Sequence, residues 1–416
     1  MPLSGLFAHV SLVPVLALLA QSAVNVHRLA PKPSRFYTGR DPDITDIKTL
    51  ITGKGYPFER HRVATSDGYV IELHRIPWGR RPPRDTRHRP AVLIMSGVLG
   101  DSSNWVLDFP NQSLGYVLAD HRYDVWMANT RGNSYGKQHR SRKVRSPAFW
   151  NFSFHEHALL DLPAQIDYVL GATGQQSIPY VGVSQGTLIM FAMLSEKPEY
   201  NSKVKAFAAM APFNKLSGVD IAALTAFAPF ADKYLTTAYE SFLFEVLARG
   251  AFYMPFARKF CGLPTRALCS IVADGVANLG SKYINESRLP VYLHFIPGGT
   301  SAKNIVHYAQ LVKSARPLKF DYGPERNLAV YGQLEPGEYQ LGNLQTDVGI
   351  FWSNGDHLIT PPNVRQLIQE LGTRVKMNHF IDDPYYTHAH FLLALNNPDV
   401  LFKALISFLD SSTDKL

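Results

Sequence analysis

The most informative part of this sequence is the stretch Tyr180-Val181-Gly182-Val183-Ser184-Gln185-Gly186-Thr187. It contains the pattern Gly-x-Ser-x-Gly, with apolar residues before and after it. A serine on a sharp turn between a strand and a helix has a strained backbone, and small residues two positions away on each side make room for the turn. We therefore predict that Ser184 is a nucleophile whose hydroxyl is lifted out of a packed sheet. The same turn aims the N–H of Gln185, at the start of the helix, at a developing oxyanion.

The segments on either side alternate between strand-like and helix-like patterns. An Asp-Gly turn at 66–68 joins two alternating runs and predicts a hairpin. Continuous apolar runs predict buried strands, and longer periodic runs predict helices. The strands are expected at 62–65, 69–76, 90–95, 123–128, 178–181, 204–210, 348–352 and 376–381, and the helices at 43–52, 114–119, 154–170 and 188–194. This order predicts an α/β fold with a mostly parallel sheet.

Residues 214–290 interrupt the alternation. They form a long, helix-like stretch rich in Phe, Leu and Ala between two core strands. An insertion at this point is placed to cover a site, so we predict a helical cap. Its apolar side chains, among them Phe230, Leu243 and Phe244, belong either to a movable lid or to permanent core.

The composition is that of a large folded protein. Of the 416 residues, 46 % are apolar and 18 % are charged, which excludes a disordered chain. The net charge is +8, and basic residues gather at 79–90 and 137–145. Neither cluster is interleaved with aromatic residues, so we interpret both as solvated loops. An anionic membrane or micelle surface is the alternative partner, and nucleic acid is not expected.

The N-terminus has the pattern of a secretory signal. Residues 10–20 are apolar, and small residues follow at 20, 22 and 23. The run is too short for a permanent membrane span, so we predict a signal peptide at 1–22 and a mature chain that is secreted or lysosomal. Three sequons then predict glycans at Asn111, Asn151 and Asn285.

The chain contains two cysteines, Cys261 and Cys269. In an oxidising compartment two cysteines this close in sequence favour a short-loop disulfide, and two buried thiols are the alternative. Neither cysteine lies near a motif that suggests catalysis.

A serine nucleophile needs a base, and the base needs a group that orients it. Asp356 follows the strand-like run 348–352, and His388 follows the last predicted strand. Taken alone, each could have a structural role, Asp356 in an Asn-Gly-Asp turn and His388 as a core or capping residue. Their order along the chain, serine, then acid, then histidine, favours a catalytic triad.

An oxyanion needs a second N–H besides that of Gln185. The turn after the strand at 90–95 is the expected source, and Gly97-Val98 occupies it. We predict that the Val98 N–H faces the Gln185 N–H across the site.

The pattern His155-Glu156-His157 has the look of a metal site. On the predicted helix, however, residues two apart face different directions. No third ligand cluster is visible, so we predict neither a metal nor another cofactor.

Taken together, these motifs closely resemble the acid lipase family, the gastric and lysosomal acid lipases of animals. The resemblance runs from about residue 41 to the C-terminus. It rests on family-like signatures at Gly55-Tyr56-Pro57-Phe58-Glu59, Thr65-Ser66-Asp67-Gly68-Tyr69, Asp101-Ser102-Ser103-Asn104-Trp105, Asn129-Thr130-Arg131-Gly132-Asn133-Ser134-Tyr135, Phe149-Trp150-Asn151-Phe152-Ser153-Phe154, Asp161-Leu162-Pro163-Ala164 and Pro297-Gly298-Gly299-Thr300-Ser301.

The resemblance implies an α/β-hydrolase fold and hydrolysis of lipid esters by Ser184, Asp356 and His388. It also implies a helical lid within 214–290 and a bridge between Cys261 and Cys269.

Three positions depart from the family pattern. Ser96 stands where a histidine is usual, Val183 stands where a large residue such as histidine is usual, and His388-Ala389-His390-Phe391 replaces His-x-Asp-Phe. These departures leave open which esters the protein hydrolyses and whether its activity is adapted to acidic pH. They also make His390 an alternative base.

The sequence therefore predicts a signal peptide at 1–22, core segments at 23–213 and 291–416, and a cap at 214–290 between them. The expected activity is hydrolysis of acylglycerols or sterol esters at a lipid–water interface. An esterase of small soluble esters and a lipid-binding protein without turnover are the alternatives.

Overall fold

The computed structural model describes residues 46–82, 89–218, 228–241, 243–249 and 282–413. The predicted signal peptide and both cysteines lie outside these residues, as does much of the predicted cap. No helix within the described ranges combines the length and the apolarity needed to cross a bilayer.

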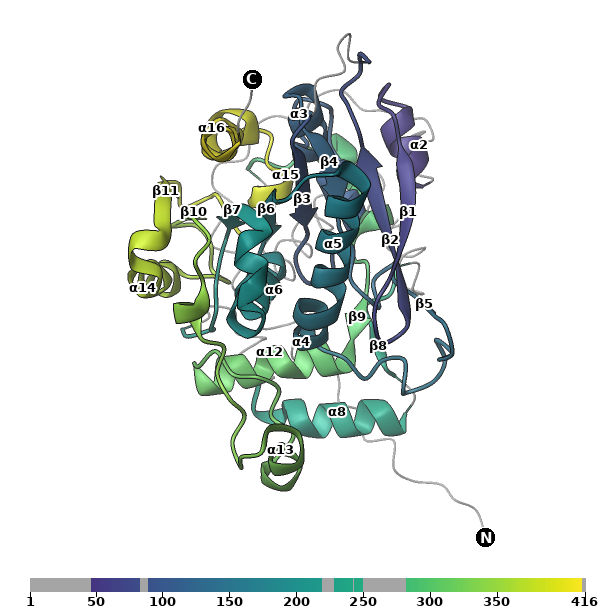
Figure 1. Ribbon diagram of the computed structural model, residues 1–416, viewed down its shortest axis with the longest axis vertical. Coiled ribbons are helices and arrows are strands. Elements are labelled where there is room, and N and C mark those ends of the chain that lie inside the picture. The colour runs from purple at the N-terminus through teal and green to yellow at the C-terminus, as the bar shows by residue number, and fades with distance from the viewer. Residues whose placement is uncertain (1–45, 83–88, 219–227, 242, 250–281, 414–416) are drawn as a thin grey trace.

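A nine-stranded sheet forms the centre of the described structure (Figure 1). Its strand order is β1-β2-β4-β3-β6-β7-β10-β11, and β5 pairs with β2. The strands from β4 to β11 in this order are parallel, whereas β2 runs antiparallel to its neighbours. Their bounds are β1 Glu59–Ala64, β2 Tyr69–Ile76, β3 Ala91–Met95, β4 Asp124–Met127, β5 Gln138–His139, β6 Ile178–Val183, β7 Val204–Met210, β10 Val348–Ser353 and β11 Val375–Ile381. The prediction of a mostly parallel α/β sheet is confirmed.

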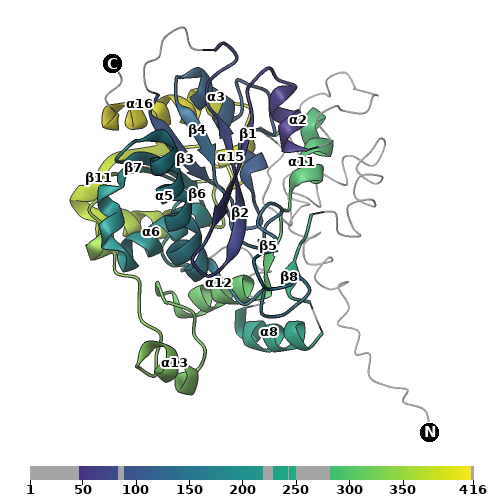
Figure 2. The same ribbon diagram turned by 45° about the vertical axis from the view of Figure 1, so that its right-hand side comes forward.

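Helices cover both faces of the sheet, so its central strands are buried on both sides and read as continuous apolar runs. Successive residues of β3 divide between two cores, with Val92 and Ile94 in one and Leu93 and Met95 in the other. The first core lies under α2 Ile47–Thr52, α3 Leu114–Asp120, α11 Leu289–Phe295, α15 His390–Leu393 and α16 Lys403–Ser412. The second lies under α5 Leu162–Thr173, α6 Gln185–Glu196 and α14 Pro361–Leu371, which stand on the opposite face (Figures 1 and 2).

The predicted helix at 154–170 is interrupted by a wider turn. It comprises α4 Phe154–Glu156, a π-helical turn His157–Asp161 and α5. Pro163 has no N–H to donate to the preceding turn, which favours a break in the α-helical ladder at this point. The turn places the Asp161 carboxylate on the side chain of Arg131, at 2.8 Å from its Nε.

The described part of the predicted cap is not wholly helical. The 3-10 turn Ala228–Phe230 and helix α8 Ala231–Glu240 are followed by β8 Glu245–Val246, which pairs with β9 Thr300–Ser301. Helix α8 packs against α12 Ala302–Ser314, below α6 in Figure 1. The predicted boundary after residue 290 falls inside α11.

The apolar side chains of the cap divide into two groups. Phe230 is 65 % exposed and Leu243 is 63 % exposed. Phe244 is buried in an aromatic cluster with Phe149, Trp150 and other core residues. Of the two alternatives, a movable lid or permanent core, the burial of Phe244 favours permanent core for this side chain.

Candidate active site

Ser184 lies at the turn between β6 and α6, with φ 53° and ψ −120°. Non-glycine residues rarely adopt positive φ, and such strain is found chiefly where function requires it. Both flanking glycines are needed for space. A Cβ on Gly182 would lie 2.8 Å from the carbonyl carbon of Gly186, and a Cβ on Gly186 would lie 2.5 Å from the Met95 oxygen.

Ser184 is largely buried, and the loop after β3 lies close to it. The residue is only 6 % exposed, and Gly97 lies against it, where a Cβ would be 3.1 Å from the Ser184 Cβ. The loop after β3 therefore lies beside the side chain of Ser184 and leaves little room for a larger residue at position 97.

Asp356 and His388 form a close pair. The Asp356 Oδ2 is 2.7 Å from His388 Nδ1, and the other carboxylate oxygen accepts the N–H groups of Leu358 and Ile359 at 2.9 and 2.8 Å. Because both oxygens are engaged, the carboxylate is fixed and the His388 proton is held on Nδ1. The ring then presents Nε2 as an acceptor.

Two contacts hold the turn that carries Asp356 against the loop that carries His388. Ser353 at the end of β10 donates to the Tyr386 carbonyl at 2.7 Å. A Cβ on Gly355 would lie 2.7 Å from the Pro384 carbonyl oxygen, so only glycine allows the two backbones to approach this closely.

His390, the alternative base, is placed differently. It is fully buried, and its Nδ1 accepts the Thr387 N–H at 2.7 Å. Its ring packs near Tyr283 and Tyr386. Of the two histidines, His388 is the one that contacts Asp356.

The turn after β3 has a defined geometry. The Gly97 carbonyl accepts the Gly100 N–H at 3.1 Å, and Leu99 between them has φ 60°. In a trans peptide the C=O and the next N–H point in opposite directions. The Val98 N–H is therefore turned away from Gly100.

Gln185 is held in place by α12. Its Oε1 accepts the Asn304 side-chain N–H at 2.8 Å and the Tyr308 hydroxyl at 3.0 Å. The first N–H groups of a helix have no intrahelical partner, which leaves the Gln185 N–H available. Sequence reasoning missed Asn304 and Tyr308, although their i, i+4 spacing on an amphipathic helix is a signal that could have found them.

Comparison with known proteins agrees with this geometry. Residues 90–391 match the family described as the alpha/beta hydrolase fold, and residues 47–109 match a partial alpha/beta-hydrolase lipase region. The chain is 34 % identical to gastric triacylglycerol lipase of Bos taurus, over 88 % of this chain and 91 % of that protein. It is 37 % identical to lipase lipl-5 of Caenorhabditis elegans, over 88 % of this chain and 92 % of the relative.

The chain belongs to the acid lipase family. The enzyme is accordingly a carboxylic ester hydrolase on the α/β-hydrolase fold. A solved Sulfolobus solfataricus protein superposes on the lipase with a TM-score of 0.54 at 13 % identity, over 85 % of this chain and 99 % of that chain. At that identity the likeness shows the fold alone.

One departure of the lipase from its family, Ser96, has a local partner. The Ser96 hydroxyl accepts the Asn104 side-chain N–H at 3.0 Å, and both residues are buried. A Cβ on Gly100 would lie 2.2 Å from the Ser96 Oγ, so this pair fills the space beneath the turn that follows β3.

Buried charges gather near the hairpin of β1 and β2. Arg131, 1 % exposed, bonds to Asp161 and also to Asp67, at 2.6 Å between Nη1 and Oδ2. Burial raises the pKa of Asp161 to about 6 against the opposing effect of Arg131. Burial, together with the Arg131 charge, lowers the pKa of His157 to about 3. Neither ring nitrogen of His157 has a hydrogen-bond partner.

His155 and His157, whose spacing resembles that of metal ligands, face apart. His155 Nδ1 lies 2.7 Å from the Tyr339 hydroxyl, whereas the His157 ring packs on Phe152. Over the ranges that the structure describes, no group of three or more His, Cys, Asp or Glu side chains is arranged to hold a metal.

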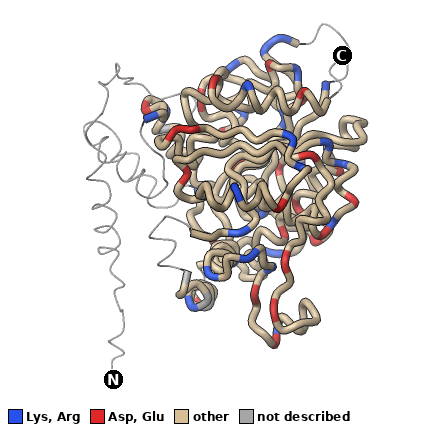
Figure 3. Tube along the Cα trace, turned by 90° about the vertical axis from the view of Figure 1, so that its left-hand side faces the viewer, with Lys and Arg blue, Asp and Glu red and all other residues tan. Residues whose placement is uncertain are grey.

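The remaining predicted sites lie on the surface or outside the described ranges. Asn111 and Asn151 are exposed, and Asn285 is partly exposed and accepts the Ser287 hydroxyl at 2.6 Å. Their glycosylation stays a prediction, as does the bridge between Cys261 and Cys269. On the face shown in Figure 3, the Lys and Arg residues that the structure describes are interspersed with Asp and Glu.

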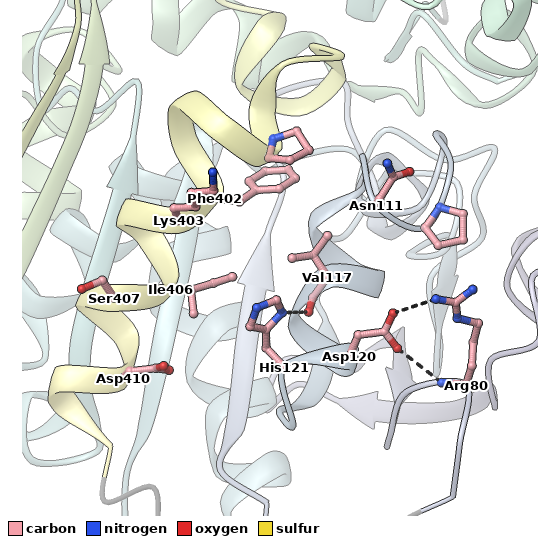
Figure 4. A pocket seen from close by; sticks show the side chains of 12 residues that line it. Arg80, Asn111, Val117, Asp120, His121, Phe402, Lys403, Ile406, Ser407 and Asp410 are labelled. Carbon is pink, nitrogen blue, oxygen red and sulfur yellow. Dashed lines mark hydrogen bonds and ion pairs between the residues drawn. The ribbon is translucent and has the colours of Figure 1, made fainter.

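A groove of about 680 Å³ lies between α3 and α16 (Figure 4). Val117, Phe402 and Ile406 line its apolar floor, and Arg80 and Asp120 pair at its rim. None of the predicted catalytic residues borders it.

Proposed function

We propose that this lipase hydrolyses lipid esters, acylglycerols or sterol esters, through an acyl-enzyme on Ser184, and that it acts as a secreted or lysosomal protein. The observation that carries the proposal is the contact between Asp356 and His388. These residues follow the parallel strands β10 and β11, and Ser184 follows β6 at the same edge of the sheet. Gastric relatives named as triacylglycerol lipases support the lipid substrate and the location.

In the first half of the reaction, the Ser184 oxygen attacks the ester carbonyl while His388 Nε2 accepts the hydroxyl proton. The tetrahedral intermediate collapses, and the C–O bond to the alcohol breaks. The alcohol leaves with the proton from His388, and the acyl group stays on Ser184.

In the second half, water attacks the acyl-enzyme and His388 accepts its proton. The bond to Ser184 breaks, the serine regains the proton, and the fatty acid leaves. Asp356 keeps the His388 ring in one tautomer and stabilises its positive charge in both halves.

The Val98 and Gln185 N–H groups stabilise the oxyanion in both tetrahedral intermediates. Removing one such donor lowers turnover by about 10² to 10³. The contact of Gly97 with Ser184 supports this assignment, since it brings the Val98 peptide beside the nucleophile.

The experiment uses Ser184→Ala, together with labelling by a serine-directed phosphonate and turnover of triolein, cholesteryl oleate and a short-chain ester. We expect the variant to fold and to be inactive, and the wild type to be labelled at Ser184 alone. Labelling at another serine, or activity in the variant, would overturn the nucleophile.

The choice of ester distinguishes the alternatives. Turnover of the short-chain ester only would indicate an esterase of soluble esters. Lipid binding without turnover of any of the three would indicate a non-catalytic lipid-binding protein.

A further inference from the structure

The side chain of Arg249, in the described part of the cap, connects three parts of the molecule. Its Nη2 contacts the Asp101 carboxylate, its Nη1 donates to the Tyr135 hydroxyl at 3.1 Å, and its Nε and Nη2 donate to the Phe295 carbonyl at 3.2 and 3.0 Å. The guanidinium also lies over the Tyr135 and Phe295 rings, 5.1 and 5.0 Å from their centres. A planar fork with five donors suits such a junction, and a lysine does not.

Asp101 connects this junction to the turn after β3. It follows Gly100 directly, and it caps the 3-10 helix Ser102–Trp105, accepting the Ser103 N–H at 3.0 Å. The Asp101 side chain is fully buried, whereas the side chain of its ion-pair partner Arg249 is 20 % exposed. The charge that holds this carboxylate therefore comes from the cap.

A second contact reaches the same turn from the segment that follows α11. The Gly298 N–H donates to the Leu99 carbonyl at 2.6 Å. Arg249 holds Phe295, three residues before Gly298, so one side chain fixes both the exit of the turn at Asp101 and the segment that binds Leu99.

We propose that Arg249 is a positioning residue for the oxyanion donor Val98, and that it couples the place of the cap to the shape of the turn Gly97–Gly100. The proposal rests on the proposed function, in which the Val98 N–H stabilises the oxyanion. Since the Gly97 carbonyl direction fixes the Val98 N–H, a shift of the turn misdirects that donor.

The test is Arg249→Lys, assayed on a soluble short-chain ester so that adsorption to lipid does not enter. Lysine keeps the positive charge near Asp101 but cannot reach Phe295 and Tyr135 at the same time. We expect kcat to fall about tenfold to a hundredfold with KM unchanged, because a small displacement of a preorganised donor is costly. The rate of phosphonate labelling at Ser184 should fall in parallel.

Glu245→Gln is the matched control. Glu245 lies in the same cap segment, but its carboxylate pairs with Lys137 of the core and not with Asp101. We expect its kcat and its labelling rate to stay within about twofold of the wild type, the size expected for a partly exposed ion pair.

Asp101→Asn is the second test, because it keeps the side-chain shape and leaves a partly exposed Arg249. We expect the same loss in kcat, and a double variant with Arg249→Lys that loses less than the sum of the two. Equal kcat in Arg249→Lys and Glu245→Gln, or a change in KM alone, would overturn the positioning role. Neither outcome would affect the proposed nucleophile, which Ser184→Ala tests separately.

Discussion

At the scale of single residues, two histidines two positions apart have different surroundings. His388 meets a carboxylate that is fixed by two N–H groups, whereas His390 accepts an N–H from its own loop. A triad base needs the first arrangement, because the carboxylate sets the tautomer that leaves Nε2 free to accept a proton.

We therefore expect His388→Ala to lower kcat by several orders of magnitude, leaving only the contribution of oxyanion stabilisation and binding. His390→Asn keeps an acceptor for the Thr387 N–H, so it should retain most activity and lose some thermal stability. Steady-state kinetics and thermal unfolding of both variants check this. If the His390 variant were the inactive one, the two roles would have to be exchanged.

The candidate site residues that could be proposed from the sequence have local signals, and those that were missed depend on tertiary contacts. Ser184 is marked by its flanking glycines, and Asp356 and His388 by their order after strands. Arg249 carries no such mark, because its partners Asp101 and Phe295 are distant in sequence. The burial of Ser184 was also not predictable, since it depends on how closely Gly97 approaches.

At the scale of elements, the buried strands were predictable because both of their faces are apolar. The antiparallel ribbon of β8 and β9 was not predictable, because strands of two residues are too short to show an alternation of apolar and polar residues. The pairing of the ribbon also depends on where α12 begins. The π-helical turn before α5 was missed for a related reason. The apolar spacing of a helix is too coarse to show a single wider turn.

The glycines in the two turns, Gly186 after β6 and Gly97 after β3, differ in which atom the methyl group of an alanine would meet. On Gly186 it would lie 2.5 Å from the Met95 carbonyl oxygen, which is backbone and cannot move cheaply. On Gly97 it would lie 3.1 Å from the Ser184 Cβ, a looser contact that a small shift of the turn or of Ser184 relieves. We expect Gly186→Ala to destabilise the fold by about 1–3 kcal/mol, the usual cost of overpacking.

Gly97→Ala should instead leave unfolding nearly unchanged and lower kcat about tenfold or more, because the nucleophile or the oxyanion turn must shift. Denaturant unfolding and turnover of a soluble ester distinguish the two variants. Equal losses of stability would contradict this division.

At the scale of the whole molecule, stability toward acid is a balance of buried groups with opposite effects. The pKa of His157 is about 3 in the folded state because of burial and the Arg131 charge, against an ordinary value of 6.5. As the pH falls below 6.5, the unfolded chain binds this proton and the folded chain does not. Between pH 7 and pH 4 this destabilises the protein by about 3 kcal/mol.

Asp108 acts in the opposite direction. Burial raises its pKa from 3.8 to about 7, so the stability that it contributes is fully present below pH 4 and is lost as the pH rises from 4 to 7. Unfolding free energies should therefore fall less steeply from pH 7 to pH 4 in His157→Leu. In Asp108→Asn they should lose the decrease that Asp108 causes as the pH rises from 4 to 7. Slopes equal to that of the wild type in both variants would contradict these assignments.

The exposed apolar residues of the cap predict a response to a lipid surface. We propose that Phe230 and Leu243 enter the apolar phase when the protein meets lipid, because leaving water lowers their free energy. We expect Phe230→Ser with Leu243→Ser to lower activity on emulsified triolein about tenfold while sparing a soluble ester. Leu328→Ser with Leu334→Ser is the matched control, since these side chains are similarly exposed but lie outside the cap. Equal losses in both pairs would contradict a specific role for the cap.

The order of the sheet divides the site between two halves of the polypeptide. Ser184 and the turn at Val98 come before the insertion, Asp356 and His388 come after it, and the halves meet where β7 pairs with β10. Neither half holds a complete site, so turnover also reports whether the two have associated. In a chain cut once within the insertion, recovery of activity after denaturation becomes a bimolecular process that slows on dilution, whereas the intact chain recovers at a rate independent of concentration.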